Sequence, residues 1–175
     1  MSDFWVFGYG SLIWRPGFAH TETQRAHLYG YRRALCIRSW VHRGTEQRPG
    51  LVLGLDHGGS CTGLAFRVPG ELRDEVLAYL RERELVTNVY RERELAVRLE
   101  TGERATAIGF VVDRSHRQYA GALHVDEAVR RVTGAVGQSG PNEEYVVSTV
   151  EHLKALGIRD HWLESVAEQL NWPPR

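Results

Sequence analysis

Short apolar runs separated by turn residues dominate the first two thirds of the chain. They predict β-strands, because short runs of apolar and β-branched residues bounded by glycine or proline are typical of strands. His57-Gly58-Gly59 lies between two of these runs and predicts a hairpin turn, and Thr101-Gly102 separates another pair. The predicted strands cover residues 5–8, 31–41, 51–56, 61–68, 90–99 and 105–112.

Four further segments have the pattern of helices. Pro141 near the start of the third segment and Gly157 after its end are helix start and stop signals. The predicted helices cover residues 71–83, 126–136, 143–156 and 160–170. The strands come in hairpins and do not alternate strictly with helices. We therefore expect a single α+β domain over residues 1–175, with a mainly antiparallel or mixed sheet closed into a small barrel and helices packed on it.

The composition fits this expectation and gives no sign of a highly charged partner. Hydrophobic residues make up 42% and charged residues 25% of the chain, as in soluble globular proteins. The 22 Lys and Arg residues balance the 22 Asp and Glu residues, so charge gives no reason to expect nucleic acid or a membrane surface as partner. No apolar stretch approaches the ~18 residues of a membrane span, and the N-terminus lacks the pattern of a signal peptide. We therefore expect a cytoplasmic protein.

The first candidate for chemistry is the loop that follows the first predicted strand. It reads Phe7-Gly8-Tyr9-Gly10-Ser11-Leu12. Glycine allows a tight turn and allows backbone N–H groups to converge on an anion. A strand-end turn without a ligand explains the same composition. A dinucleotide-binding loop is a poor match because the third glycine of that motif is missing.

The second candidate is Glu84, at the end of the first predicted helix. The apolar stripe of this helix consists of Val76, Leu77 and Leu80. Glu84 lies four residues beyond the last of them, so it projects from the same face if the helix continues that far. Burial there would raise the pKa of the carboxyl group toward neutrality, as a general acid and base requires. The alternatives are a side chain that turns into solvent, or a structural ion pair with a neighbouring arginine.

The third candidate is the glycine-rich stretch at residues 137–145, which runs into a helix and ends at Tyr145. Such a stretch can form the edge of an anion or substrate site, whereas Tyr145 can equally be a packing residue of the core. The eight histidines are scattered singly, without the spacing of a zinc site, and Ser11 lacks the surroundings of a nucleophilic serine. We therefore expect no metal and no serine-hydrolase chemistry.

Taken together, these segments resemble the ChaC-type γ-glutamylcyclotransferases. The matching pieces occur in the family's order over nearly the whole chain: VFGYGSLIW at 6–14, YRR at 31–33, GLAFR at 63–67, YLRERE at 79–84 and GQSGPNEEY at 137–145. The resemblance implies a small mixed β-barrel with flanking helices. It also implies a cofactor-free carbon–nitrogen lyase of the amidine-lyase class, which releases 5-oxoproline and, from glutathione, cysteinylglycine.

The resemblance also assigns roles to residues. Glu84 matches the catalytic glutamate of the family. The loop formed by Tyr9, Gly10, Ser11 and Leu12 resembles the element whose backbone N–H groups hold the α-carboxylate of the γ-glutamyl group. Arg33 and Tyr145 match positions near the substrate. Two alternatives remain open: a cyclotransferase for other γ-glutamyl amino acids or amines, and a non-catalytic module that binds γ-glutamyl peptides.

Overall fold

The computed structural model describes residues 1–85 and 88–174. The chain divides into two compact units, each made of two stretches of sequence. Residues 1–33 and 55–113 form the first unit, and residues 34–54 and 114–175 form the second. The expectation of one domain over residues 1–175 stays a prediction.

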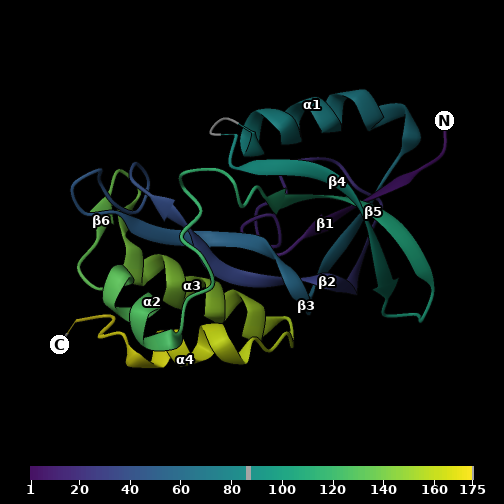
Figure 1. Cartoon of the computed structure of the whole chain (residues 1–175). Helices are drawn as coiled ribbons and strands as arrows, with labels where there is room; N and C mark the ends of the chain where they lie inside the picture. The colour runs from purple at the N-terminus through teal and green to yellow at the C-terminus, as the bar shows by residue number, and fades with distance from the viewer. Residues whose placement is uncertain (86–87, 175) are drawn as a thin grey trace. The chain divides into compact units, whose positions relative to one another are not determined.

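A closed five-stranded barrel is the main feature of the fold (Figure 1). Around the barrel the strands follow the order β1, β3, β2, β4, β5, and β1 pairs antiparallel with β3 and parallel with β5. The predicted mixed barrel is therefore confirmed. The strands are β1 (Phe4–Gly8), β2 (Glu22–Ser39), β3 (Gly50–Val68), β4 (Tyr90–Leu99) and β5 (Arg104–Val112).

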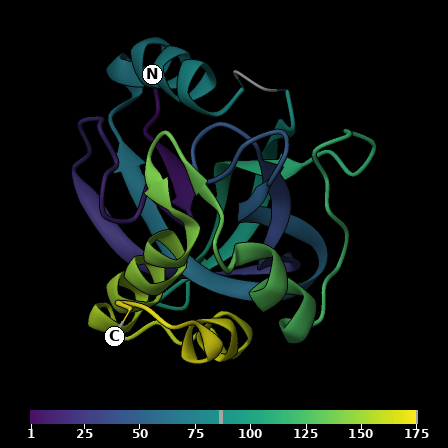
Figure 2. The same cartoon turned by 90° about the vertical axis from the view of Figure 1, so that its left-hand side faces the viewer.

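Helix α1 (Arg73–Glu84) packs on the barrel strands of the first unit, as Figures 1 and 2 show. It follows a short 3-10 turn at Gly70–Leu72. Its buried residues are the predicted stripe. Glu75 and Glu82 are exposed, as expected because each lies about half a turn around the helix from Glu84. The shared core consists of Phe4, Val6, Leu12, Val68, Val76, Leu77, Leu80, Ile108 and Phe110.

Two strand predictions were wrong. The hairpin expected at His57-Gly58-Gly59 does not form, because β3 continues through it as one strand. Gly58 and Gly59 adopt φ values of +99° and +70° within that strand, a use of glycine that is common where a barrel strand bends. Strand β2 begins at residue 22, nine residues before the predicted start at 31.

The second unit is mainly helical, with α2 (Val125–Val132), α3 (Asn142–Ala155) and α4 (His161–Gln169). Both α2 and α3 pack against α4, and Figure 2 shows the three helices together. All three were predicted, but α2 ends at residue 132 and not at 136. Gly134 has a positive φ of +80°, and the chain then enters a small two-stranded sheet of β6 (Val136–Gly137) and β7 (Gly140–Pro141).

Candidate active site

The loop after β1 folds into a compact turn on the first unit. The Ile13 N–H donates to the Gly10 carbonyl at 2.9 Å, and the Arg15 N–H donates to the Ser11 carbonyl at 2.8 Å. Among the described residues, the N–H groups of residues 10–12 have no hydrogen-bond acceptor. Consecutive unpaired N–H groups form a small positive concavity, so this loop is suited to hold a carboxylate.

Arg33 fixes the start of this loop to the barrel. Its side chain is only 4% exposed. Its Nε donates to the Tyr9 carbonyl at 2.6 Å and its Nη2 donates to the Thr62 carbonyl of β3 at 2.7 Å. These contacts orient the loop, so Arg33 has a positioning function whether or not it also reaches the substrate. The expected direct contact with substrate stays a prediction.

Glu84 is the last residue of α1, and its side chain is 17% exposed. Burial raises the pKa of its carboxyl group above the ordinary value, and the nearby Arg83 guanidinium partly opposes this rise. The distance from Arg83 Nε to Glu84 Oε1 is 3.8 Å. Within the described part of the chain, the Glu84 carboxylate accepts no hydrogen bond. It is therefore a poorly solvated carboxyl group whose pKa lies above its ordinary value.

Arg83 is one of the neighbouring arginines expected as a structural ion-pair partner of Glu84, and its contact with the loop after β1 was not predicted. Its guanidinium donates to Ser11 Oγ at 2.8 Å, to the Arg15 carbonyl at 2.6 Å and to the Tyr79 hydroxyl at 3.1 Å. One side chain thus touches the loop and stands beside Glu84. The sequence could have indicated only the contact between Arg83 and Tyr79, because these residues are four positions apart and lie on one face of the helix.

Tyr145 lies in the first turn of α3, in the second unit. Its hydroxyl accepts a hydrogen bond from the Leu53 N–H at 3.0 Å, and the Arg43 guanidinium stands over its ring at 5.4 Å from the centroid. Buried Asn142, at the start of α3, exchanges hydrogen bonds of 2.8 and 2.9 Å with the backbone of Leu51. These contacts join α3 to β3 within the second unit. The substrate contact expected of Tyr145 stays a prediction.

The described residues hold no cluster of three or more His, Cys, Asp or Glu side chains able to bind a metal ion. Of the helices in the described part of the chain, none has the length and apolar character needed to cross a membrane.

The fold is that of the γ-glutamylcyclotransferases. The crystal structure of a γ-glutamylcyclotransferase specific to glutathione from yeast superimposes with a TM-score of 0.83 at 25% sequence identity. The match covers 97% of this chain and 98% of the yeast chain.

The chain belongs to the ChaC family. The family model described as "ChaC-like protein" matches residues 4–172. The glutathione-specific γ-glutamylcyclotransferase of Escherichia coli is 35% identical over 162 residues, which cover 93% of this chain and 70% of the relative. Glutathione-specific γ-glutamylcyclotransferase 1 of Rattus norvegicus is 31% identical over 170 residues, covering 94% of this chain and 77% of the relative.

Proposed function

We propose that this protein is a glutathione-specific γ-glutamylcyclotransferase that converts glutathione into 5-oxoproline and cysteinylglycine. The observation that carries the proposal is Glu84, a mostly buried carboxyl group of raised pKa. Family membership and the similarity to glutathione-specific enzymes support the same substrate. The reaction needs neither a metal nor a second substrate, because the nucleophile and the electrophile belong to one molecule.

The first task of the site is to hold the γ-glutamyl group in a folded conformation. The α-carboxylate would accept hydrogen bonds from the N–H groups of residues 10–12, which places the α-amine near its own γ-carbonyl carbon. Orientation of this kind can contribute several kcal/mol, up to about 7–11 in favourable models. Arg33 and Arg83 support this task by fixing the two ends of the loop to β3 and to α1.

The second task is proton transfer. At neutral pH the substrate amine is mostly an ammonium ion, which cannot attack a carbonyl. Ionised Glu84 would take a proton from it, so that the nitrogen forms the new bond to the γ-carbon. Glu84 would then return a proton to the cysteine nitrogen as its bond to that carbon breaks. Over the whole reaction the attacking nitrogen loses two protons and the leaving nitrogen gains two, so the products balance without water or an oxidant.

Tyr145 remains a candidate for substrate contact and for stabilising the oxyanion of the tetrahedral intermediate. A backbone N–H of the loop after β1 is the other candidate for that oxyanion. Donors aimed at the developing negative charge lower the barrier of acyl transfer.

The test is to incubate the purified protein with reduced glutathione, without added metal or nucleotide, and to quantify both products by mass spectrometry. Equal amounts of 5-oxoproline and cysteinylglycine are expected. Glu84→Gln should lower kcat by about 10²–10⁴-fold, whereas Glu82→Gln, the same change at an exposed position of the same helix, should leave kcat unchanged. Full activity of the Glu84→Gln variant would disprove the role of this residue.

A panel of γ-glutamyl donors tests the substrate. If γ-glutamyl-alanine is cyclised and glutathione is not, the proposed type of reaction is confirmed and the proposed substrate is disproved. If glutathione binds and no donor is cyclised, the protein is a binding module and not an enzyme.

A further inference from the structure

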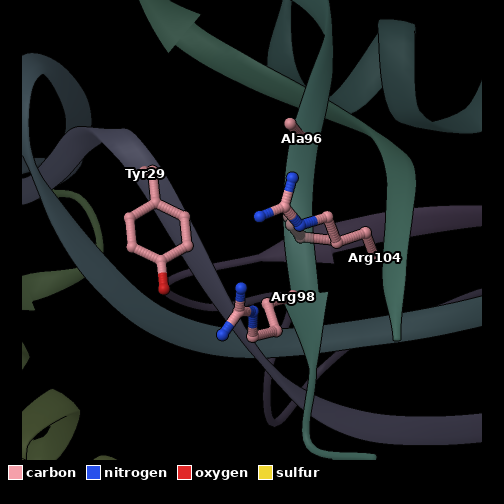
Figure 3. Close-up of a pocket in the computed structure, with 5 residues that line it drawn as sticks. Tyr29, Ala96, Arg98 and Arg104 are labelled. Atoms are coloured by element: carbon pink, nitrogen blue, oxygen red, sulfur yellow. The ribbon is translucent and has the colours of Figure 1, made fainter. Parts of the chain in front are cut away.

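A small hollow lies on the outer wall of the barrel, within the first unit (Figure 3). Its volume is about 310 Å³. It is lined by Tyr29 of β2, by Ala96, Val97 and Arg98 of β4 and by Arg104 of β5. None of these residues belongs to the loop after β1 or to α1, so the hollow is distinct from the candidate active site.

The alternation of side chains along the strands explains why the hollow is exposed. Val97 points into the barrel and is 2% exposed, so its neighbours Ala96 and Arg98 lie on the outer face. On β5 the residues buried against α1 are Ile108 and Phe110. Arg104 lies four residues before Ile108 and therefore on the same face, but it is exposed.

Two positive charges meet in this hollow, and no acidic side chain of the described residues pairs with either of them. Arg98 and Arg104 are directly opposite each other in the register of β4 and β5. Like charges at opposite positions destabilise a sheet. Within the described residues, neither guanidinium makes an ion pair or a hydrogen bond. Glu100, two residues after Arg98 in the sequence, is already paired with Arg25 at 3.4 Å.

Tyr29 adds an aromatic ring and a hydroxyl group to the lining of the hollow. Its side chain is 57% exposed, and its ring contacts the His27 ring edge to face, with centroids 4.7 Å apart. His27 is itself held by a 2.9 Å hydrogen bond between its Nδ1 and Thr62 Oγ1. Figure 3 shows the guanidinium groups of Arg98 and Arg104 both extending toward the Tyr29 side chain.

We propose that this hollow binds a small phosphorylated molecule through its phosphate group. Guanidinium groups match the oxygen geometry of phosphate and bind it with paired, charge-assisted hydrogen bonds. A phosphate dianion would offset the repulsion between Arg98 and Arg104 more fully than a single carboxylate. The volume is at the lower end of the range for small-molecule sites. The ring of Tyr29 provides an apolar wall for the group that carries the phosphate. The proposal does not depend on the proposed function.

The test is an NMR titration of the ¹⁵N-labelled protein with inorganic phosphate at constant ionic strength. Saturable shifts are expected for amides of residues 96–98 and 104–106. The double variant Arg98→Gln/Arg104→Gln should bind at least about tenfold more weakly, as expected when charge-assisted hydrogen bonds are removed. Arg93→Gln, at an exposed arginine of the same strand, is the matched control and should bind as the wild type does.

Phenyl phosphate tests the role of Tyr29. It should bind more tightly than inorganic phosphate, and Tyr29→Ala should remove that difference. A second readout is thermal unfolding, in which phosphate should raise the Tm of the wild type but not that of the double variant. A ¹H–¹⁵N spectrum of the double variant that matches that of the wild type outside residues 96–106 shows that it is folded. Equal phosphate affinity of the wild type and the double variant, or shifts confined to residues 10–12, would overturn the proposal.

Discussion

Replacement of Arg83 is the sharpest test of how the candidate active site is assembled. This side chain is 19% exposed and touches both the loop after β1 and the surroundings of Glu84. Arg83→Met removes the hydrogen bonds to the loop together with the positive charge. Arg83→Lys keeps the charge but replaces the planar donor fork with a single ammonium group. The two variants therefore separate the effect of geometry from that of charge.

The expected size of the effect follows from the contacts. Hydrogen bonds from a charged group contribute about 1.5–3 kcal/mol each when they are buried. The strongest contacts of Arg83 are those to Ser11 Oγ at 2.8 Å and to the Arg15 carbonyl at 2.6 Å. Because the side chain is partly exposed, water replaces some of this energy. We expect a loss of about 1–3 kcal/mol in transition-state stabilisation for Arg83→Met, which is roughly 5- to 150-fold in kcat/KM.

The pH dependence gives a second signature. The Arg83 charge lowers the pKa of Glu84, against the dominant effect of burial. Without that charge the pKa rises further. Since the ionised carboxylate is the proposed base, the acidic limb of the kcat/KM profile should move to higher pH in Arg83→Met. In Arg83→Lys the limb should stay near its wild-type position while KM rises.

The assay is initial-rate kinetics with glutathione over a range of pH. The matched control is Arg81→Met. Arg81 is an exposed arginine on the same helix, and it pairs with Glu92 at 2.7 and 3.0 Å. Exposed ion pairs of this kind contribute little to the free energy of folding, so the Arg81→Met variant should keep wild-type kinetics. A wild-type pH profile and an unchanged kcat/KM in Arg83→Met would refute the positioning role.

Two glutamates should show opposite effects of pH on stability. The pKa of Glu84 is raised by burial, so the free energy of unfolding of the wild type should fall as pH rises from the ordinary value of 4.5 through the raised pKa. Chemical denaturation at neutral pH should therefore find Glu84→Gln at least as stable as the wild type, and a less stable variant would contradict the burial argument. Hydrogen bonds from Arg159 lower the pKa of Glu164 to about 2. Glu164→Gln should thus be less stable than the wild type at neutral pH, and the difference should vanish as pH falls from 4.5 to about 2. A difference that persists at the acidic end would show that another interaction is responsible.

The sequence predicted those elements whose hydrophobic pattern is simple. Strand β4 has the predicted bounds, because Leu95, Val97 and Leu99 alternate with exposed residues. The first part of β2 was missed because its buried positions include Gln24 and Ala26, which give a weak apolar signal. The pair Gly58-Gly59 is typical of a turn in the sequence. In the closed barrel it instead lies within the continuous strand β3.

The candidate site was predictable where one element defines it. The position of Glu84 follows from the apolar stripe of a single helix, and the structure places it at the end of that stripe. Arg83 was not predictable in the same way, since its hydrogen bond to Ser11 joins residues that are 72 positions apart. The contacts of Arg33 with Tyr9 and Thr62 are equally non-local. Such contacts depend on the closed barrel and not on any local pattern.

Glutamate lies in opposite electrostatic settings at two helix ends of this chain. Glu164 is in the first turn of α4, where the helix dipole favours a negative charge, and Arg159 donates hydrogen bonds to it. Glu84 is at the last residue of α1, where the dipole disfavours a negative charge, and its described neighbours provide only a 3.8 Å contact. A purely structural role would be better served by glutamine at this position, because glutamine carries no charge to desolvate. The attraction of Arg83 only partly offsets the effect of burial, so stability gives little reason for a carboxylate at Glu84, whereas the proposed proton transfer requires one. Glu84→Gln should therefore stabilise this helix end and, at the same time, lower the rate of cyclisation.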